Sequence, residues 1–310
     1  MKLSKKEAEK IAGNYNLGKI QYVKLIPSGW GNFSFDFKTN KGEFIVQVLG
    51  RKLDRGNMLF QFKLVNFLKK INFPYETPAP LKTKNNNYFM LVKGKHFWVY
   101  RKIIGKIVHK LNSNQLKELA KTLAIYHKSV SKFNIKKKKE LNYKWLENKY
   151  NKFENVKPKN KIDRLILNNL GFFKKTVDKL KKYDWGNNFL VCHADLSGDN
   201  VVFRNGKIMG IIDFNNLEYS PLSSDIAISL YETSVKRGVL DKKRYKTFLK
   251  EYEKINKLTK KDKNLIIPLI ADYYCYLFWW HYEGMQKHRH IRYGELKDDI
   301  YAIQNLSKFF

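Results

Sequence analysis

The sequence predicts an α+β protein of two lobes, a β-rich N-terminal lobe over residues 1–104 and a mainly helical C-terminal lobe over residues 105–310. Three observations indicate this division. Short segments rich in β-branched and aromatic residues dominate the first part, apolar residues recur at helical spacing from Asn112 onward, and one strand-and-hairpin pattern begins at Phe189. A hydrophobic fraction of 43% over 310 residues suffices for a large core or two modest ones.

The N-terminal lobe is predicted to contain a small sheet and two helices. Ser4, followed three residues later by Glu7, has the form of a capping box for a helix over Ser4–Asn14. Apolar residues at helical spacing predict a second helix over Met58–Lys70. The predicted strands are Ile20–Pro27, Asn32–Lys38, Glu43–Leu49, Tyr88–Val92 and His96–Ile104.

The C-terminal lobe is predicted to be helical apart from one buried strand and one hairpin. Helices are expected from Asn112, over Tyr143–Phe153, over Ile162–Tyr183 and through Ser224–Phe310. Strands are expected over Phe189–Cys192, Asn200–Arg204 and Lys207–Phe214. Asn205 and Gly206 between the last two are a strong hairpin signal, because both residues tolerate positive φ.

Composition limits the partners and the compartment. The chain has 61 Lys and Arg against 28 Asp and Glu, a formal charge of +33, which attracts anions. The lysines are spread through every segment, which indicates a compositional background and disfavours a dedicated nucleic-acid or membrane partner. Cys192 and Cys275 are too few for a disulfide framework and suit a reducing compartment, the cytoplasm. No apolar run approaches the ~18 residues of a membrane span.

Chemistry-bearing side chains gather around the predicted hairpin. His193 and Asp195 follow the buried strand, Asn200 begins the hairpin, and Asp213 ends it. Because a hairpin brings its ends together, we expect the side chains of Asp195 and Asn200 to lie near Asp213. Carboxylate and carboxamide oxygens suit Mg²⁺, and a carboxylate that does not bind the metal can accept a hydroxyl proton. The pattern is that of a phosphoryl-transfer site in which a hydroxyl group attacks.

The spacing of His193, Asp195 and Asn200 matches the catalytic loop of protein-kinase-like enzymes. Ala194, where protein kinases have Arg, resembles the aminoglycoside phosphotransferase and choline kinase superfamily, and within it the type II homoserine kinases. Further matches to that branch are Tyr15 to Gly18, Gly29 to Asn32, Leu123 to His127, and Asp225 to Ala227. The resemblance covers most of the chain to about Leu230.

The resemblance implies a two-lobed protein-kinase-like fold with ATP in the cleft between the lobes. It implies that Asp195 is the base, that Asn200 and Asp213 hold Mg²⁺, and that His193 braces the loop backbone. Asp225 would support the catalytic loop from beneath. Small residues and backbone N–H groups allow close approach to phosphates, so a turn over the ATP phosphates would be formed by Gly29, Gly31 and Asn32.

The sequence departs from the kinase pattern at the nucleotide site. The strand position that usually carries a phosphate-pairing Lys is Gln47. The helix that should supply its acidic partner has no Asp or Glu from Gly56 to Lys70, with Asn66 as the nearest substitute. Losing both members of an ion pair together leaves no unpaired charge. Arg51 or Lys52, just beyond the strand, could reach the phosphates instead.

The predicted activity is transfer of the ATP γ-phosphoryl group to the hydroxyl of a small amino alcohol, with homoserine favoured by the resemblance. Aminoglycoside, choline and methylthioribose kinases are the alternatives. A charge of +33 disfavours polycationic aminoglycosides unless four acids gather near the pocket mouth: Glu218, Glu232, Asp272 and Glu283. Homoserine's carboxylate, in contrast, would suit a basic pocket.

A different class of function is a pseudokinase or a basic nucleic-acid-binding module built on the same fold. Gln47 and Asn66 favour that alternative, whereas the retained residues Asp195, Asn200 and Asp213 oppose it. His127, on an apolar helix face, is predicted to be a hydrogen-bonded core residue.

Overall fold

The computed structural model describes residues 2–26, 33–49, 55–134, 143–236, 238–286 and 293–309. The chain divides into two units, Met1–Val108 with Asn200–Asn215, and His109–Asp199 with Asn216–Phe310. The first unit carries an antiparallel sheet and the second is mainly helical. The hairpin that bears Asn200 and Asp213 is therefore part of the sheet unit, although it follows the first helices of the helical unit in sequence.

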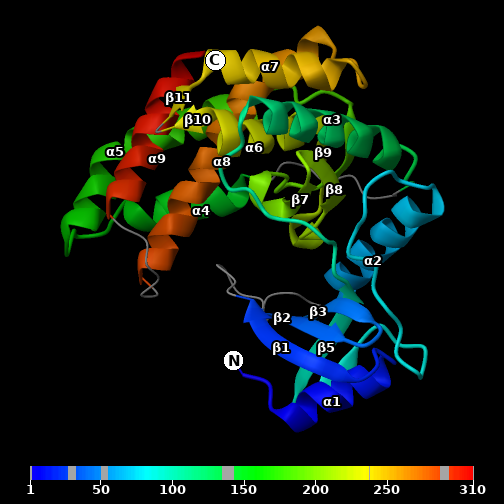
Figure 1. Ribbon diagram of the computed structural model, residues 1–310. Coiled ribbons are helices and arrows are strands. Elements are labelled where there is room, and N and C mark those ends of the chain that lie inside the picture. Colours follow the sequence, from blue (N-terminus) through cyan, green and yellow to red (C-terminus); the bar gives the residue numbers. More distant parts are fainter. Residues whose placement is uncertain are drawn as a thin grey trace. The chain divides into compact units, whose positions relative to one another are not determined.

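The sheet unit is built on one antiparallel sheet with the strand order β1-β2-β3-β5-β4 (Figure 1). The strands are β1 (Ile20–Ile26), β2 (Ser34–Thr39), β3 (Gly42–Val48), β4 (Met90–Val92) and β5 (Lys95–Arg101). Each lies within a few residues of its predicted range. β3 is paired on both sides, with β2 and β5, so it is an interior strand.

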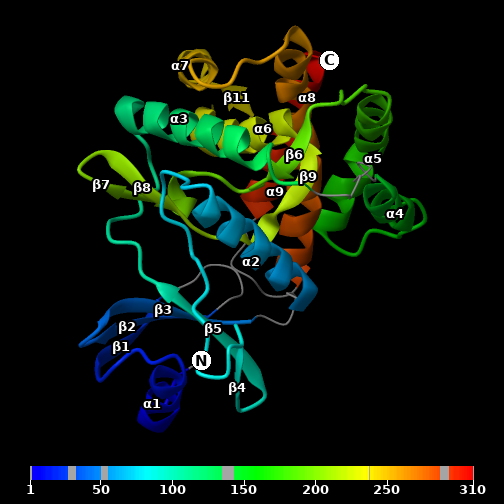
Figure 2. The same ribbon diagram turned by 90° about the vertical axis from the view of Figure 1, so that its right-hand side faces the viewer.

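Two helices cover the two faces of this sheet (Figure 2). Alternate residues of β3 point to opposite faces. Phe44 and Val46 share a buried cluster with the apolar side of α1 (Lys5–Asn14). Ile45, from between them, packs in a second cluster with α2 (Arg55–Lys70). The predicted capping box is confirmed at the start of α1.

The hairpin of β7 (Val201–Arg204) and β8 (Lys207–Ile211) belongs to the same unit. Asn205 and Gly206 have φ of 51° and 76°, so both central turn residues are in the left-handed region, as predicted. Gly210 allows close packing, since a Cβ there would lie 2.7 Å from the carbonyl oxygen of Glu76.

The second hairpin strand is shorter than predicted. β8 ends at Ile211 rather than Phe214, because Asp213 takes a left-handed φ of 60° and a 3₁₀ turn follows over Phe214–Asn216. The left-handed residue redirects the chain, so the prediction that the strand reaches Phe214 was wrong.

The helical unit contains most of the remaining elements. They are α3 (Ser113–Val130), α4 (Lys144–Phe153), α5 (Lys161–Lys181), β6 (Phe189–Cys192), β9 (Glu218–Pro221), α6 (Leu222–Ser234), β10 (Val235–Lys236), β11 (Val239–Leu240), α7 (Lys242–Glu253), α8 (Lys260–Gln286) and α9 (Tyr293–Leu306). β6 pairs with β9, a strand that the sequence did not predict. β10 pairs with β11, so the prediction of helix throughout Ser224–Phe310 was wrong at this short hairpin.

Helix α8 is the main packing element of this unit and contacts α4, α5, α6 and α9 (Figure 2). Its buried face carries Phe278 and Trp279, which pack on Tyr150 of α4 and Phe173 of α5. Large aromatic side chains of this kind dominate core energetics. Within the described part of the chain, no helix is both long and apolar enough to cross a membrane.

Candidate active site

The loop that follows β6 is held by a single carboxylate. Asp225, at the start of α6, accepts hydrogen bonds from the backbone N–H groups of His193 and Ala194, both at 2.8 Å. Each carboxylate oxygen takes one of the two consecutive donors. The loop that carries Asp195 is therefore fixed to helix α6 through its backbone.

Ala194 has a left-handed φ of 57°. This conformation costs an L-residue with a Cβ about 1–2 kcal/mol, and it persists only where its surroundings impose it. The hydrogen bond to Asp225 is such a constraint. We infer that the loop is held in a strained conformation, which directs the next residue, Asp195, away from the buried strand.

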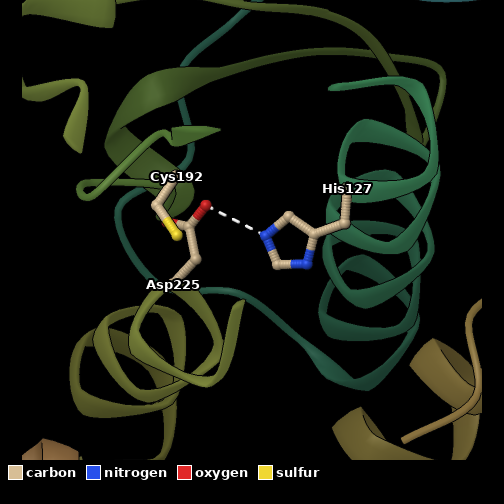
Figure 3. Close-up of side chains that lie close together, drawn as sticks. All are labelled: His127, Cys192 and Asp225. Carbon is tan, nitrogen blue, oxygen red and sulfur yellow. Dashed lines mark hydrogen bonds and ion pairs between the residues drawn. The ribbon is translucent and has the colours of Figure 1, made fainter. Parts of the chain in front are cut away.

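Asp225 lies fully buried in a hydrogen-bonded network (Figure 3). Besides the two N–H groups, it is bonded at 3.0 Å to Nε2 of His127, from α3. The other ring nitrogen of His127 lies 2.6 Å from the Tyr252 hydroxyl. Burial alone would raise the pKa of Asp225, but the bonds from His127 and His193 hold it below its usual range. The prediction that His127 is a hydrogen-bonded core residue is confirmed.

Figure 3 also shows Cys192 beside Asp225 and His127, with potential ligand atoms of the three residues within 4.8 Å of one another. Both nitrogens of His127 and both oxygens of Asp225 already take part in hydrogen bonds. The Cys192 thiol points to the carbonyls of Ser220 and Pro221, and burial raises its pKa well above the usual value. A thiolate is therefore disfavoured, and the cluster acts as a structural support rather than a metal site.

Asp195 is half-buried and belongs to the helical unit. Its Oδ2 accepts a hydrogen bond of 3.1 Å from Nδ2 of Asn216, a residue that the sequence analysis did not single out. The bond limits the rotation of the carboxylate. The only sequence signal of Asn216 is its place as the second of two Asn residues, three positions after Asp213. This signal is weak alone.

His193 is fully buried, and its ring meets Tyr126 edge-on at a centroid distance of 6.3 Å. Tyr126 donates to the carbonyl oxygen of Val191 at 3.0 Å. His193 contacts Asp225 through its backbone N–H, while the side chain of His193 packs in the core.

Asn200 and Asp213 lie at one end of the β7–β8 hairpin, in the sheet unit. The N–H of Ile212 donates to the carbonyl oxygen of Asn200 at 2.9 Å, which closes that end. Asp213 is exposed, accepts from Nδ2 of Asn215, and helps to raise the pKa of the Tyr100 hydroxyl. Asn200 and Asp213 offer the hard oxygen donors that Mg²⁺ selects, so the donor set fits this ion.

The predicted phosphate turn is not part of the described structure. Gly29, Gly31 and Asn32 lie outside the described residues, as do Arg51 and Lys52.

Gln47 is half-buried in β3, on the face that α2 covers. Nδ2 of Asn66 donates to the Tyr88 hydroxyl at 3.2 Å, and among the described residues no hydrogen bond joins Asn66 to Gln47. A different polar residue of α2, Gln61, is 3% exposed, and its Oε1 has no hydrogen-bond partner among the described residues. Gln61 was missed because a Gln in a helix carries no sequence signal of burial.

Comparison with known proteins gives one family match. Residues 23–255 match the model of the phosphotransferase enzyme family. The matched range includes the whole Asp195 loop, the hairpin and Asp225.

Individual relatives agree with this match. A homoserine kinase of Bradyrhizobium diazoefficiens is 25% identical over 263 residues, which are 83% of this chain and 77% of the relative. An amicoumacin kinase solved with AMP-PNP and Ca²⁺ matches 97% of this chain and 92% of its own, with a TM-score of 0.72 and 16% identity. A microcompartment-associated aminopropanol kinase matches 92% and 90%, with a TM-score of 0.70 and 12% identity. The predicted α+β, protein-kinase-like fold is confirmed.

Proposed function

The chain belongs to the phosphotransferase enzyme family, and we propose that it transfers the γ-phosphoryl group of ATP to the hydroxyl of a small amino alcohol, with homoserine favoured. The observation that carries this proposal is the loop at Asp195. Asp225 holds two consecutive N–H groups of the loop, and Asn216 holds the Asp195 carboxylate. Such rigid positioning of one carboxylate is what a general base requires.

In the proposed reaction Asp195 accepts the proton of the acceptor hydroxyl. The hydroxyl oxygen forms a bond to the γ-phosphorus as the bond between that phosphorus and the bridging oxygen breaks, and ADP leaves. The hydrogen bond from Asn216 keeps the carboxylate turned in one direction, which reduces the reorganisation that proton transfer requires.

Asn200 and Asp213 would hold Mg²⁺ in this proposal. Bound there, the ion would neutralise negative charge on the ATP phosphates. The N–H of Ile212, the residue before Asp213, donates to the carbonyl oxygen of Asn200. This hydrogen bond closes the hairpin end and fixes the distance between the backbones of Asn200 and Asp213. Gly29, Gly31 and Asn32, which lie outside the described residues, are proposed to contribute N–H groups to the phosphates.

Two findings support an amino alcohol as the acceptor. The relative from Bradyrhizobium is a homoserine kinase, and its match spans most of both chains. A solved structure of the same fold is an aminopropanol kinase. Both named acceptors carry a hydroxyl and an amine, so this chemistry is the shared element.

The function can be tested by an ATP-consumption assay with Mg²⁺ across homoserine, choline, methylthioribose and an aminoglycoside. We expect turnover with homoserine to exceed the rate without acceptor by at least about 100-fold, as acid–base catalysis and positioning typically contribute this much. Turnover with choline, methylthioribose or the aminoglycoside, but not with homoserine, would contradict the assignment of homoserine as the acceptor. ATP binding without turnover on any acceptor would favour the pseudokinase alternative.

Replacing Gln47 by Ala tests whether this residue takes the place of the usual phosphate-pairing Lys. If Gln47 hydrogen-bonds the nucleotide, its loss removes about 1 kcal/mol and raises the KM for ATP about fivefold. The matched control is Gln21→Ala on β1, where the side chain is exposed. Equal KM values for ATP in the two variants would exclude a role for Gln47.

A further inference from the structure

Helix α7 and the beginning of α8 line a cavity of about 440 Å³ in the helical unit. This volume is in the range of small-molecule sites, roughly 300–1,000 Å³. None of the lining residues belongs to the candidate active site. Five of them are lysines: Lys246, Lys250, Lys254, Lys257 and Lys263. A cavity of this size with five ammonium groups at its walls is a candidate site for an anion.

Three of these five lysines have no acidic partner. Lys254 is paired with Glu251 at 2.7 Å. Lys263 is paired at 2.8 Å with Glu253, which also lines the cavity. The other three have ammonium groups that form no ion pair or hydrogen bond with the described residues: Lys246, Lys250 and Lys257. Uncompensated charges of one sign around a concave surface raise its potential and attract ions of the opposite sign.

The lysine-rich composition of the chain does not account for this group. Residues 242–257 include seven Lys and Arg among 16, whereas the whole chain has 61 among 310. The lysines also share one helix face, because Lys246, Lys250 and Lys254 follow one another at intervals of four residues. Like charges at this spacing destabilise a helix. The stripe is therefore unfavourable for folding alone, and a bound anion would offset the repulsion.

The helix that carries the stripe is fixed by its opposite face. Phe248 and Tyr252 are fully buried, and α7 packs on α3 (Figure 2). The Tyr252 hydroxyl also lies 2.6 Å from Nδ1 of His127 on α3. Because the backbone of α7 is held in this way, the lysine side chains extend from fixed positions around the cavity. An anion that enters the cavity would meet ammonium groups that are already gathered.

The cavity also offers an apolar wall and a neutral donor. Leu249 is 8% exposed and Tyr245 is half-buried, and both line the cavity. The Tyr245 hydroxyl forms no hydrogen bond within the described part of the chain. Burial raises the pKa of Tyr245, so the phenol keeps its proton and can donate to an anion.

The donor set favours phosphate over carboxylate. The arginine of α7, Arg244, does not line the cavity, and its Nε donates to the carbonyl oxygen of Thr233 at 2.6 Å. The planar fork of an arginine matches a carboxylate, whereas an ammonium group is a point charge with three donors and suits a tetrahedral phosphate. Adjacent phosphate groups place several negative charges within a short length. The carboxylates of Glu251 and Glu253 limit the positive area, which favours a short anion over a nucleic-acid chain.

We propose that this cavity binds an anion with two or more adjacent phosphate groups, held by Lys246, Lys250 and Lys257. The inference concerns the helical unit alone and does not depend on the proposed phosphoryl transfer. Inorganic polyphosphate and nucleoside polyphosphates share the required chemistry, and the test below separates them. Most lysines of the chain remain a compositional background, whereas these three would bind a ligand.

Acetylation of individual lysines measures occupancy of this cavity separately from binding at the nucleotide site. The full chain is treated with a limiting amount of an acetylating reagent at increasing concentrations of tripolyphosphate, and mass spectrometry quantifies the modification at each lysine. A bound phosphate raises the pKa of an ammonium group, so acetylation of the three proposed ligands should slow at least about fivefold. Lys117 and Lys121 are exposed on α3 outside the cavity and should change less than about twofold.

The double variant Lys246→Gln/Lys250→Gln tests the proposed ligands, with Lys257 as the reporter. Loss of two charged hydrogen bonds should weaken the binding of tripolyphosphate at least about tenfold. The matched control Lys117→Gln/Lys121→Gln removes two exposed lysines at the same spacing and gives the same net charge. It should change the dissociation constant less than about twofold, because salt screens distant charges.

The substituted side chains are exposed, so both double variants should fold as the wild type does. If Lys246→Gln/Lys250→Gln does not fold, the single variant Lys257→Gln, with Lys246 as the reporter, provides the same comparison. Weaker binding of tripolyphosphate to Lys257→Gln than to the control would support the proposal. Equal binding would contradict it.

Four results would overturn the proposal. The first is no protection of the three lysines, or equal protection of Lys117 and Lys121. The second is equal dissociation constants for the two double variants, since net charge would then explain the attraction. The third is equal protection by citrate at the same concentration, which would exclude a preference for phosphate. The fourth is an RNA oligonucleotide that binds more tightly than tripolyphosphate and also protects Lys242 and Lys243.

A nucleoside triphosphate distinguishes the two sources of the phosphate groups. If GTP protects the three lysines at a concentration at least about tenfold lower than tripolyphosphate does, the base and ribose contribute and the ligand is a nucleoside polyphosphate. Equal protection, or tighter binding of tripolyphosphate, indicates an inorganic polyphosphate. Both results support the site, because both require the same lysines.

Discussion

Replacing Asp195 by Asn is expected to lower kcat by about 10³-fold or more, because the amide cannot accept the hydroxyl proton. Asn keeps the size of the side chain, so the fold should be unchanged. The structure supports this expectation, because the N–H groups of His193 and Ala194 fix the loop to Asp225, and the substitution leaves these two hydrogen bonds in place. The measurement is steady-state phosphoryl transfer at saturating ATP and acceptor, together with thermal unfolding of both proteins.

The matched control is Asp184→Asn, an exposed acid in the same unit whose partner is Lys261. It should leave kcat within about twofold, as surface substitutions away from functional sites usually have small effects. If Asp195→Asn retains the activity of this control, the proposed mechanism is wrong. If Asp195→Asn unfolds at a lower temperature, its loss of activity cannot be assigned to chemistry, and Asp195→Glu then provides the second comparison.

Replacing Asp225 by Ala is expected to have the largest effect on stability. The free energy of unfolding should fall by about 3–5 kcal/mol, because the change removes a buried carboxylate and leaves its hydrogen-bond partners unsatisfied. The change leaves the ring of His127 and two backbone N–H groups buried without their acceptor. Urea unfolding at pH 7 measures this loss, and Asp241→Ala, which removes only the N-cap of α7, should cost about 1 kcal/mol.

The pH dependence of this stabilisation follows from the lowered pKa of Asp225. A carboxylate with a folded pKa below its ordinary 3.8 stabilises the protein above about pH 4, and the stabilisation is lost as the pH falls through the lowered value. The difference between wild type and Asp225→Ala should therefore shrink below pH 4. A loss in Asp225→Ala no greater than in Asp241→Ala would show that Asp225 does not hold the loop.

Variants of Asp225 also distinguish structural support of the loop from participation in the phosphoryl-transfer reaction. Asp225 does not bind the acceptor in the proposed mechanism and acts through the position of the loop. Asp225→Asn, which retains one oxygen acceptor, should keep more stability and more activity than Asp225→Ala. Asp195→Asn, in contrast, should lose activity without losing stability. This opposite pattern in the two variants distinguishes a positioning residue from a catalytic one.

Local signals explain which parts of the fold the sequence predicted well. The capping box at Ser4 and the turn at Asn205 and Gly206 depend on residues within a few positions of each other, and both are present in the structure. Strand β9 was missed because its partner β6 lies more than 25 residues earlier and the segment has no strong alternation of its own. The left-handed turn at Asp213, which ends β8, also lacked the usual Gly or Asn signal.

The residues of the candidate site likewise divide into those that the sequence predicted and those that it missed. The spacing of His193, Asp195 and Asn200 was visible in sequence because the motif is contiguous. Asn216 was not assigned a role, since its significance depends on a contact with Asp195, which lies 21 residues earlier.

The central claim is that Asp195 promotes phosphoryl transfer from ATP to the hydroxyl of an amino alcohol. The most direct test is ³¹P NMR of wild type and Asp195→Asn incubated with ATP, Mg²⁺ and homoserine. The account predicts that the wild type produces ADP and an equal amount of a phosphate monoester of homoserine, and that Asp195→Asn produces neither at a comparable rate. Wild-type protein that forms ADP and inorganic phosphate without any phosphate monoester, or an Asp195→Asn variant that forms the monoester at the wild-type rate, would contradict it.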